Sequence, residues 1–375
     1  MSSKLISTGI EFPDSSTQTT AATAGATDFS ALTDATVSTT DPATDTNPSA
    51  TGHHWINKTS GEYFVCTDNT TDENVWTNIG EGVDGVAPIT WYGDRGVFAG
   101  MYTTTEVDTI EYISISTTGN ATDFGNLTVS RFLPAACSDG SRGVFGGGRT
   151  SATAILNEID YITISTIGNA TDFGNLSAAR RELGSCSDDT RGVFGGGYGS
   201  VNENTLDYIT IASAGNATDF GDLTLARYAP AACSNGTRGV FGGGHDGAAT
   251  SNTMDYITIQ TTGNAQDFGD LTVNRYALTS CSDATRGVFA GGWNNGAGAI
   301  DYITIATTGN ALAFGNLSAA RYFLSGCSNG TRGVFGGGNG PQNTIEYITI
   351  ATTGNATDFG DLTAAYTDLA AASGD

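Results

Sequence analysis

The eight residues TRGVFGGG at positions 237–244 are one of six near-identical copies that run through the chain. The other copies begin at Asp94, Ser141, Thr190, Thr285 and Thr331, and the arginines of successive copies are 46 to 49 residues apart. This interval is the size of one supersecondary unit, whereas a catalytic motif has no reason to recur at a fixed spacing. The pattern therefore predicts an array of six similar units.

Residues 227–275 show the signals of four strands within one unit. The segments YAPAACS and RGVFGGG flank NGT, and Asn-Gly between two apolar runs is a strong hairpin signal. MDYITI alternates and is rich in β-branched and aromatic residues, TTGNAQ supplies turn residues, and DFGDLTVNR closes the unit. Each repeat is predicted to be a four-stranded antiparallel sheet.

Such sheets are too small to fold alone, but sheets packed face to face around an axis bury both faces of each. With 52 Gly among 375 residues and few helix formers, the chain is predicted to be all-β, with a six-bladed β-propeller at residues 84–375. APITWYGD at residues 87–94 is expected to supply the first strand of the first unit. TDLAAASGD at residues 367–375 either adds to the first unit as a ring-closing strand or forms a frayed tail.

Two charged positions recur with the repeat. The acid that opens the third strand and the arginine that closes the fourth should be cross-strand neighbours, which predicts one ion pair within each unit. The acids are Glu111, Asp160, Asp207, Asp255, Asp301 and Glu346, and the arginines are Arg131, Arg180, Arg227, Arg275 and Arg321. Tyr366 replaces the last arginine, which is expected to leave Glu346 without this partner. Eleven of the thirteen arginines thus recur at fixed positions and are expected to be architectural.

The formal charge of -24 is expected to repel nucleic acid and anionic membranes at long range. The sequence has no apolar run long enough for a membrane span and no secretory signal at its start, which predicts folding in a cytoplasm. Cys66 has no evident disulfide mate. Five cysteines at equivalent repeat positions are predicted to be small buried thiols: Cys137, Cys186, Cys233, Cys281 and Cys327.

The order of features within the repeat resembles the kelch family of β-propellers. The shared features are an apolar strand ending in a glycine doublet, a variable loop, an aromatic strand, and a final L...R before the next unit. The resemblance spans residues 84 to about 372. The chain departs from the kelch pattern where Phe in DFGNL replaces the usual fourth-strand Trp, and where the third-strand aromatic residue is Tyr.

The N-terminal region carries a second resemblance. GIEFPDSSTQTTAA at residues 9–22 is similar to the opening of many bacteriophage tail-fibre proteins. HHWINKTSGEYFVCTDNTTDENVWTNIG at residues 53–80 resembles a short module found in phage fibre and structural proteins. Together these segments imply a virion appendage that is assembled in the host cytoplasm and exposed on the particle. Because fibres are commonly trimeric, a homotrimer joined through this region is expected.

The predicted organisation has three parts. Residues 1–50 are interpreted as an extended attachment segment and connector that contacts other virion proteins, because their Thr, Asp, Ala and Pro-rich stretch lacks a helical period. Residues 51–83 are predicted to be a small β-rich module with a minimal core of Trp55, Tyr63, Phe64 and Trp76. The propeller follows at residues 84–375.

The sequence contains no evident catalytic motif. The GGG runs are not followed by GK[ST], and a GxSxG motif is missing. The three histidines and the missing CxxC do not make a zinc pattern. We therefore expect no enzymatic activity, metal site or cofactor.

The segments that break the repetition are the candidates for recognition. Between the glycine run and the third strand, six loops differ in length and chemistry while their flanks stay nearly constant, and these loops are expected to project from one face of the ring. Aromatic rings and amides would suit a carbohydrate or protein ligand, although neutral variation of exposed loops explains the same pattern. The candidate ligand-binding residues are Tyr102, Arg149, Tyr198, His245, Trp293, Asn294, Asn295 and Asn339. A second variable set is predicted to serve in packing: Phe132, Arg181, Tyr228, Tyr276 and Tyr322.

The sequence-based hypothesis is a bacteriophage tail or head fibre whose propeller is a receptor-binding adhesin for a host-surface glycan or protein. The first alternative is a purely structural virion protein that decorates or connects other subunits. The second alternative is a polysaccharide-degrading enzyme.

Overall fold

The computed structural model describes residues 4–6, 9–11, 17–18, 35–40, 42–43, 45–48, 50–57, 63–71, 74–80, 93–151, 153–294 and 298–374. The described residues form strands, turns and loops, which confirms the all-β prediction for this part of the chain. The chain divides into two compact units, Met1–Ala87 and Pro88–Asp375. The predicted boundary at residue 84 lies outside the described residues and stays a prediction.

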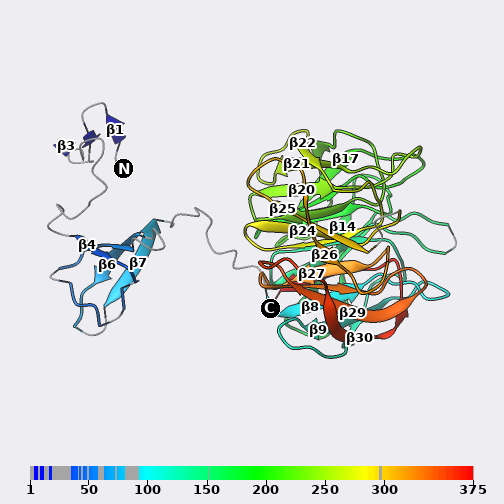
Figure 1. The fold of residues 1–375 in the computed structure, drawn as a ribbon, viewed down its shortest axis with the longest axis horizontal. Helices are drawn as coiled ribbons and strands as arrows, with labels where there is room; N and C mark the ends of the chain where they lie inside the picture. Colours follow the sequence, from blue (N-terminus) through cyan, green and yellow to red (C-terminus); the bar gives the residue numbers. More distant parts are fainter. Residues whose placement is uncertain are drawn as a thin grey trace. The chain divides into compact units, whose positions relative to one another are not determined.

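The first unit contains two small sheets (Figure 1). One is antiparallel and has the order β1 (Lys4–Ile6), β2 (Gly9–Glu11) and β3 (Thr17–Gln18). The other has the order β4 (Ala35–Ser38), β5 (His54–Asn57), β6 (Tyr63–Asp68) and β7 (Val75–Gly80), with β4 parallel to β5. The rings of Trp55 and Trp76 meet edge to face in this sheet, with centroids 5.7 Å apart.

Strands β1 to β4 lie within residues 1–50, the stretch that is interpreted as an attachment segment and connector, and they pair into sheets. Strands of two to four residues show too little periodicity to be recognised from sequence. The edge strand of the four-stranded sheet, β4, therefore comes from residues 1–50.

The second unit contains six four-stranded antiparallel sheets in its described residues. The first sheet has the order β10 (Thr122–Asn126), β9 (Thr109–Ser114), β8 (Arg95–Ala99) and β31 (Ala370–Gly374). The second to sixth sheets follow chain order: β11 (Ala135–Ser138), β12 (Arg142–Gly146), β13 (Glu158–Thr163) and β14 (Thr171–Asn175); β15 (Gly184–Ser187), β16 (Arg191–Gly195), β17 (Thr205–Thr210) and β18 (Thr218–Asp222); β19 (Ala231–Ser234), β20 (Arg238–Gly242), β21 (Thr253–Thr258) and β22 (Gln266–Asp270); β23 (Thr279–Ser282), β24 (Arg286–Ala290), β25 (Ala299–Thr304) and β26 (Leu312–Asn316); β27 (Ser325–Ser328), β28 (Arg332–Gly336), β29 (Gln342–Thr349) and β30 (Thr357–Tyr366).

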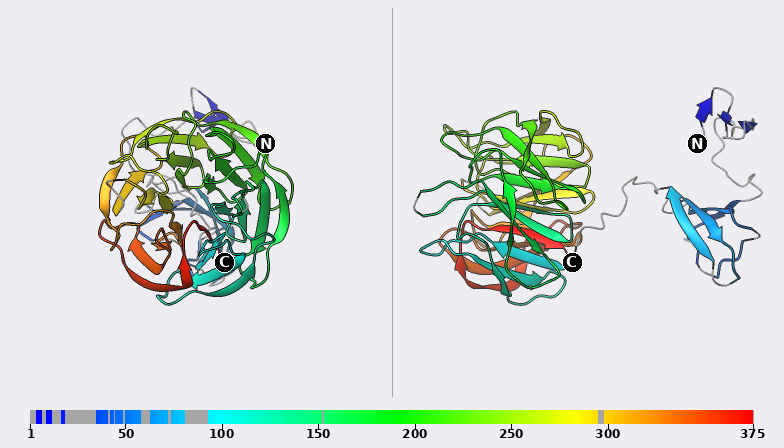
Figure 2. Two further views of the ribbon diagram at one scale, coloured as in Figure 1. Left: turned by 90° about the vertical axis from the view of Figure 1, so that its right-hand side faces the viewer. Right: turned by 180° about the vertical axis from the view of Figure 1, so that it is seen from behind.

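The repeated sheets give the second unit a propeller-like fold. In the left view of Figure 2 the colours run from cyan through green and yellow to red around a common axis. The six repeats predict six four-stranded sheets, the number found in the described residues of the second unit, and the β4-β5-β6-β7 sheet of the first unit brings the total to seven. The difference arises because the small module forms a four-stranded sheet of its own. None of these sheets closes on itself.

The C-terminal strand completes the first sheet. β31 pairs with β8 from Ala370 opposite Ala99 to Gly374 opposite Arg95, and β9 occupies the other edge of β8. The prediction that APITWYGD supplies this strand is wrong, because a strand has only two edges and both are taken. Residues 87–92 of that segment lie outside the described residues. Of the two alternatives for the C-terminal segment, addition to the first sheet is confirmed.

Buried apolar clusters join successive sheets. Val144 of the second sheet packs in one cluster with Phe194 of the third. Val334 of the sixth sheet packs in the same way with Phe98 of the first. The Val and Phe of RGVF therefore point to opposite faces of each sheet, as strand alternation predicts. A buried side chain of this kind stabilises the fold by about 1.5–3 kcal/mol.

A ring of serine hydroxyls links the inner strands. Each hydroxyl donates a hydrogen bond of 2.6–2.8 Å to the carbonyl oxygen of the equivalent serine in the preceding sheet. Because Ser138 of the second sheet donates to Ser373 in β31, the bonds return to their starting point. The six serines are Ser138, Ser187, Ser234, Ser282, Ser328 and Ser373.

The outer strands are linked by a second set of bonds. The backbone N–H of Ala170 donates to the carbonyl oxygen of Asn126 in the preceding sheet at 2.8 Å. Equivalent bonds join all six neighbouring pairs, and Ala121 of the first sheet donates to Asp361 of the sixth at 2.8 Å. The turn that carries the recurrent GNA sequence is therefore a contact between sheets as well as a reversal of the chain.

Buried ion pairs connect the end of one repeat to the sheet of the next. Arg131 precedes β11 and donates to Asp160 in the second sheet, with 2.7 Å between Nη2 and Oδ2. The same arrangement recurs in four further pairs: Arg180–Asp207, Arg227–Asp255, Arg275–Asp301 and Arg321–Glu346. The predicted pairing within one unit is wrong, because each arginine lies in the connection that has already crossed to the next sheet.

Glu111, and not Glu346, is the acid without an arginine partner among the described residues. Glu346 pairs with Arg321, whereas the carboxylate of Glu111 accepts hydrogen bonds from the backbone N–H and the hydroxyl of Thr363. The expectation for Glu346 is wrong for the reason just given. Each arginine pairs with the acid of the next sheet, and the sheet that follows the last repeat is the first sheet. Because Tyr366 replaces the arginine of the last repeat, the acid of the first sheet, Glu111, is the one without an arginine.

The six arginines of RGVF also serve the architecture. Arg142 donates to the carbonyl oxygen of Ile211 in the next sheet at 3.1 Å, while its guanidinium carbon lies 4.7 Å from the ring centre of Tyr161. Equivalent contacts recur at the other five: Arg95, Arg191, Arg238, Arg286 and Arg332. The architectural role expected for eleven of the thirteen arginines is confirmed.

The cysteines of the repeats are buried and free, as predicted. Burial raises the pKa of the Cys327 thiol to about 12, and it raises the pKa of the equivalent thiols in the same direction. These thiols are protonated at neutral pH and act as small apolar side chains.

Candidate functional site

Six residues, each two positions before the first residue of an inner strand, form a hydrogen-bonded ring. Each backbone N–H donates to the carbonyl oxygen of the preceding member at 2.7–3.0 Å, and Leu133 donates to Asp368, so that the set is cyclic. All six have a left-handed backbone with φ between 52° and 63°, which costs a residue with a Cβ about 1–2 kcal/mol. The members of this axial ring are Leu133, Glu182, Ala229, Ala277, Phe323 and Asp368.

The residue before each member of the axial ring pairs with the residue that follows a glycine run. Phe132 and Arg149 exchange backbone hydrogen bonds of 3.1 and 2.9 Å, and Tyr228 and His245 do the same. The glycines bring these two backbone segments close together. For example, a Cβ on Gly148 would lie 2.8 Å from the carbonyl oxygen of Phe132. The twelve residues joined in this way, here called the aromatic belt, are Tyr102, Phe132, Arg149, Arg181, Tyr198, Tyr228, His245, Tyr276, Trp293, Tyr322, Asn339 and Thr367.

Ring contacts run along the aromatic belt. Tyr228 stacks on His245 with centroids 5.2 Å apart, and it meets Tyr198 and Tyr276 edge to face at 6.1 and 5.7 Å. Trp293 meets Tyr322 edge to face at 4.7 Å and remains 49% exposed. This surface therefore offers rings that are held in place by neighbours and are still open to solvent.

The two arginines that do not recur with the repeat both lie in the aromatic belt. The guanidinium carbon of Arg149 is 5.2 Å from the ring centre of Phe132, and that of Arg181 is 4.8 Å from the ring centre of Tyr198. Arg181 also forms an ion pair with Glu182 of the axial ring. Both cations are therefore held at the rim of the axial ring, against aromatic faces.

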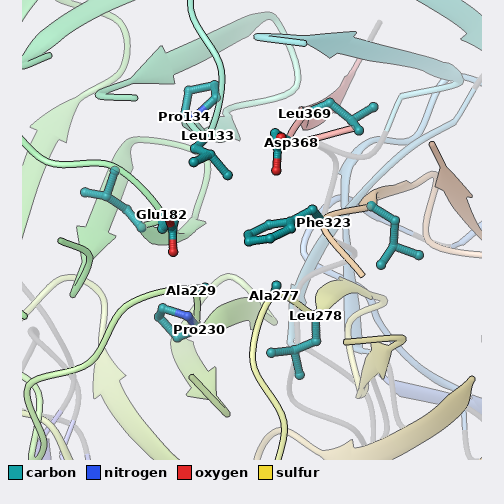
Figure 3. A pocket seen from close by; sticks show the side chains of 12 residues that line it. Leu133, Pro134, Glu182, Ala229, Pro230, Ala277, Leu278, Phe323, Asp368 and Leu369 are labelled. Carbon is teal, nitrogen blue, oxygen red and sulfur yellow. The ribbon is translucent and has the colours of Figure 1, made fainter. Parts of the chain in front are cut away.

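A cavity of about 70 Å³ opens at the axial ring, and Figure 3 shows the side chains around it. Most of the residues in its wall are apolar, and Phe323 reaches toward its centre, while Glu182 and Asp368 are the two acids in the wall. We refer to this cavity as the axial cup. The residues that line it are Leu133, Pro134, Glu182, Leu183, Ala229, Pro230, Ala277, Leu278, Phe323, Leu324, Asp368 and Leu369.

The two carboxyl groups of the axial cup have different surroundings. The side chain of Glu182 is 5% exposed, its Oε1 pairs with Arg181, and its Oε2 is buried with no hydrogen-bond partner among the described residues. Burial raises the pKa of Asp368 to about 7, against the opposing attraction of Arg181 and Arg149. The axial cup thus combines an acid with one free acceptor oxygen and an acid that titrates near neutral pH.

The structure brings six of the eight predicted site residues into the aromatic belt. Asn294 is different, because its amide donates to Thr250 Oγ1 and to the Asn274 carbonyl oxygen, each at 3.1 Å, and so bridges two loops. Asn295 lies outside the described residues. The six are Tyr102, Arg149, Tyr198, His245, Trp293 and Asn339.

Sequence reasoning assigned the second variable set to packing, whereas the structure places it in the same surface as the first. Phe132, Arg181, Tyr228, Tyr276 and Tyr322 are half-buried, and each contacts a predicted site residue. Their variation between repeats was a usable signal, because the neighbouring strand residues barely vary.

The carboxyl groups of the axial cup belong to no motif, and their one sequence signal is that they break an otherwise apolar repeat position. Glu182 and Asp368 occupy positions where the other repeats carry Leu, Ala or Phe.

In the part of the chain that the structure describes, no group of three or more His, Cys, Asp or Glu side chains is placed to hold a metal ion. The described residues also contain no helix that could span a membrane. No protein-family model and no curated protein matches the chain.

Proposed function

We propose that the second unit is a six-bladed, kelch-like propeller displayed on a bacteriophage tail or head fibre, where it binds a glycan or protein of the host surface. The observation that carries this proposal is the aromatic belt, whose side chains differ from sheet to sheet on a framework of near-identical sheets. Constant strands fix the backbone, while the variable positions set the chemistry.

The exposed rings of the aromatic belt suit a carbohydrate or a protein side chain. Aromatic faces stack on the C–H groups of sugars, and Tyr and Trp also donate hydrogen bonds. Trp293 and Tyr198 are partners of other rings, and Trp293 is exposed to solvent while Tyr198 is half-buried. Their orientation is thus set before a ligand arrives, which lowers the entropy lost on binding.

Attachment through the N-terminal region completes the proposal. The resemblance of residues 9–22 and 53–80 to phage fibre segments supports a role for the first unit in contacting other virion proteins, with three chains joined there. In the same proposal the protein is assembled in the host cytoplasm, is exposed on the particle, and has no catalytic activity of its own.

Binding of the fluorescently labelled full-length protein to arrayed bacterial surface glycans and to whole bacterial cells tests the proposal. Tyr198→Ala and Trp293→Ala are each expected to weaken binding by about tenfold or more, because truncating an aromatic anchor typically costs about 2 kcal/mol. Leu312→Ala is the matched control, because Leu312 is a large apolar side chain that is 58% exposed on β26, away from the aromatic belt.

Two outcomes would overturn the adhesin role. Absence of binding to every glycan and cell type would do so, as would equal binding by the two belt variants and wild type. A map of the intact particle that shows the aromatic belt buried against other virion subunits would favour a purely structural role. Release of sugar from a bound polysaccharide would favour a degrading enzyme.

A further inference from the structure

We propose that the axial cup binds a primary ammonium group carried on an aliphatic stem. This inference rests on the residues of the axial cup and does not depend on the proposed adhesin role. The argument has three parts: an acceptor oxygen without a donor, a second acid beside it, and an apolar wall that leaves room for a small group.

The acceptor is Glu182 Oε2. The carboxylate is almost completely buried, and Arg181 engages its other oxygen. A buried carboxylate oxygen without a donor costs stability, and such groups are rare in folded proteins. An N–H donor that enters the axial cup would satisfy this oxygen.

The second acid is Asp368, which belongs to the same axial ring. Figure 3 shows it on the wall of the axial cup, and Leu133 separates it from Glu182 along the axial ring. The charged groups that face Asp368 are Arg149 and Arg181, and Arg181 is already paired with Glu182. The high pKa of Asp368 means that the surrounding positive charge does not offset the desolvation of its ionised form. A ligand cation would supply that charge.

The wall of the axial cup selects the shape of the ligand. Leu133, Ala229 and Ala277 of the axial ring are apolar, and the aromatic ring of Phe323 also lines the cavity. An ammonium group is attracted to carboxylates and to aromatic faces, while an alkyl stem matches the apolar wall. The cavity of about 70 Å³ accommodates a small head group and excludes a bulky one.

Titration of full-length protein with n-butylammonium chloride by calorimetry, with backbone amide NMR to locate the contact, tests the proposal. The expected result is saturable binding that shifts the amide signals of Glu182, Ala229 and Asp368. Glu182→Gln and Asp368→Asn are each expected to lower the affinity about tenfold, the size of one charged hydrogen bond. Both changes keep the side-chain shape, and Asn tolerates a left-handed backbone.

Controls separate the axial cup from general attraction to an acidic protein. Asp172→Asn removes one negative charge from an exposed position on β14 and is expected to leave the affinity unchanged. Neutral n-butanol is expected not to bind. Equal affinity in the Glu182→Gln, Asp368→Asn and wild-type proteins, or equal binding of n-butanol, overturns the proposal.

The pH profile gives a readout that a merely structural role would not move. Because n-butylammonium stays protonated, its affinity for the wild type should rise by up to about tenfold between pH 6 and pH 8 as Asp368 ionises. The Asp368→Asn variant should show a flat profile, and a flat wild-type profile contradicts the inference. Nα-acetyl-lysine amide, whose ammonium group is carried on an aliphatic stem, should bind, and glucosamine, whose ammonium group is attached to a ring, should not; the reverse result contradicts the inference.

Discussion

The hydroxyl of Ser138 donates a hydrogen bond of 2.6 Å to the carbonyl oxygen of Ser373, which lies 235 residues later in the chain. Ser138 belongs to the second sheet, and Ser373 belongs to β31, which completes the first. The axial ring also links the first and last repeats, because Leu133 donates to Asp368. The bonds between outer strands do the same, because Ala121 donates to Asp361. Three sets of hydrogen bonds thus join the first repeat to the last, and two of them use residues of the C-terminal segment, Asp368 and Ser373.

Deletion of residues 370–375 is expected to destabilise the second unit as a whole. β8 would lose its partner along five residue pairs, and the hydroxyl of Ser138 would lose its acceptor. At about 0.5–1.5 kcal/mol for each net hydrogen bond, the free energy of unfolding should fall by about 3 kcal/mol or more. Urea unfolding followed by tryptophan fluorescence and circular dichroism measures the loss. Deletion of Asp375 alone is the control, and an equal effect of both deletions would contradict the role of β31.

The buried pair of Arg227 and Asp255 provides a second prediction. Asp255→Asn leaves the Arg227 cation buried without its counter-ion, and breaking such a pair typically costs about 3–5 kcal/mol. Glu111→Gln is the comparison, because this buried acid has Thr363 and not an arginine as its partner. A smaller loss is expected for Glu111→Gln in equilibrium unfolding, since no cation is stranded. Equal losses would show that the ion pair contributes nothing beyond its hydrogen bonds.

Asp368 predicts a specific dependence of stability on pH. Its pKa is about 7 in the folded protein and near 3.8 as an ordinary carboxyl group, so over this window the folded state holds a proton that the unfolded state has lost. The contribution of Asp368 to the free energy of unfolding therefore falls as pH rises from about 4 to 7 and stays low above that. Asp368→Asn should gain stability relative to wild type across this window, measured by urea unfolding at several pH values. The exposed Asp172→Asn variant should run parallel to wild type, and a parallel profile for Asp368→Asn would refute the assignment.

The repeated strands were predictable because each carries a strong local signal. RGVF alternates, NGT marks a hairpin, and six copies reinforce one another. What the sequence did not show was the offset between repeat and sheet: the arginine that closes one repeat lies in the next sheet, as Arg131 and Asp160 demonstrate. That offset arises where the chain passes from one sheet to the next, and no residue type marks this point.

The site was partly predictable for a related reason. Tyr198, His245 and Trp293 follow glycine runs, so their variation stands out against constant flanks. Glu182 and Asp368 occupy single positions inside long repeats, and neither a motif nor a spacing distinguishes them from surface acids. Their nearness depends on the cyclic arrangement of the axial ring, which places residues from distant repeats around one cavity.

The glycine of RGVF gives the last prediction, and the chain supplies its own control. A Cβ on Gly239 would lie 2.4 Å from Cys186 Sγ of the preceding sheet, whereas the atoms nearest to a Cβ on Gly143 would be those of Ile162 and Ile164, at 3.3 Å or more. The difference exists because the sheet that precedes Gly143 is completed by β31, which carries alanine where the other inner strands carry cysteine.

Gly239→Ala should therefore lower the free energy of unfolding by about 1–3 kcal/mol, the usual cost of overpacking, and Gly143→Ala should lower it less. Replacing the thiol makes room for the added methyl group, so that Cys186→Ala combined with Gly239→Ala should be less destabilising than the sum of the two single changes. A double-mutant cycle in urea measures this coupling directly. Strict additivity, or an equal cost at Gly143 and Gly239, would show that the cysteine does not explain why glycine occupies this position.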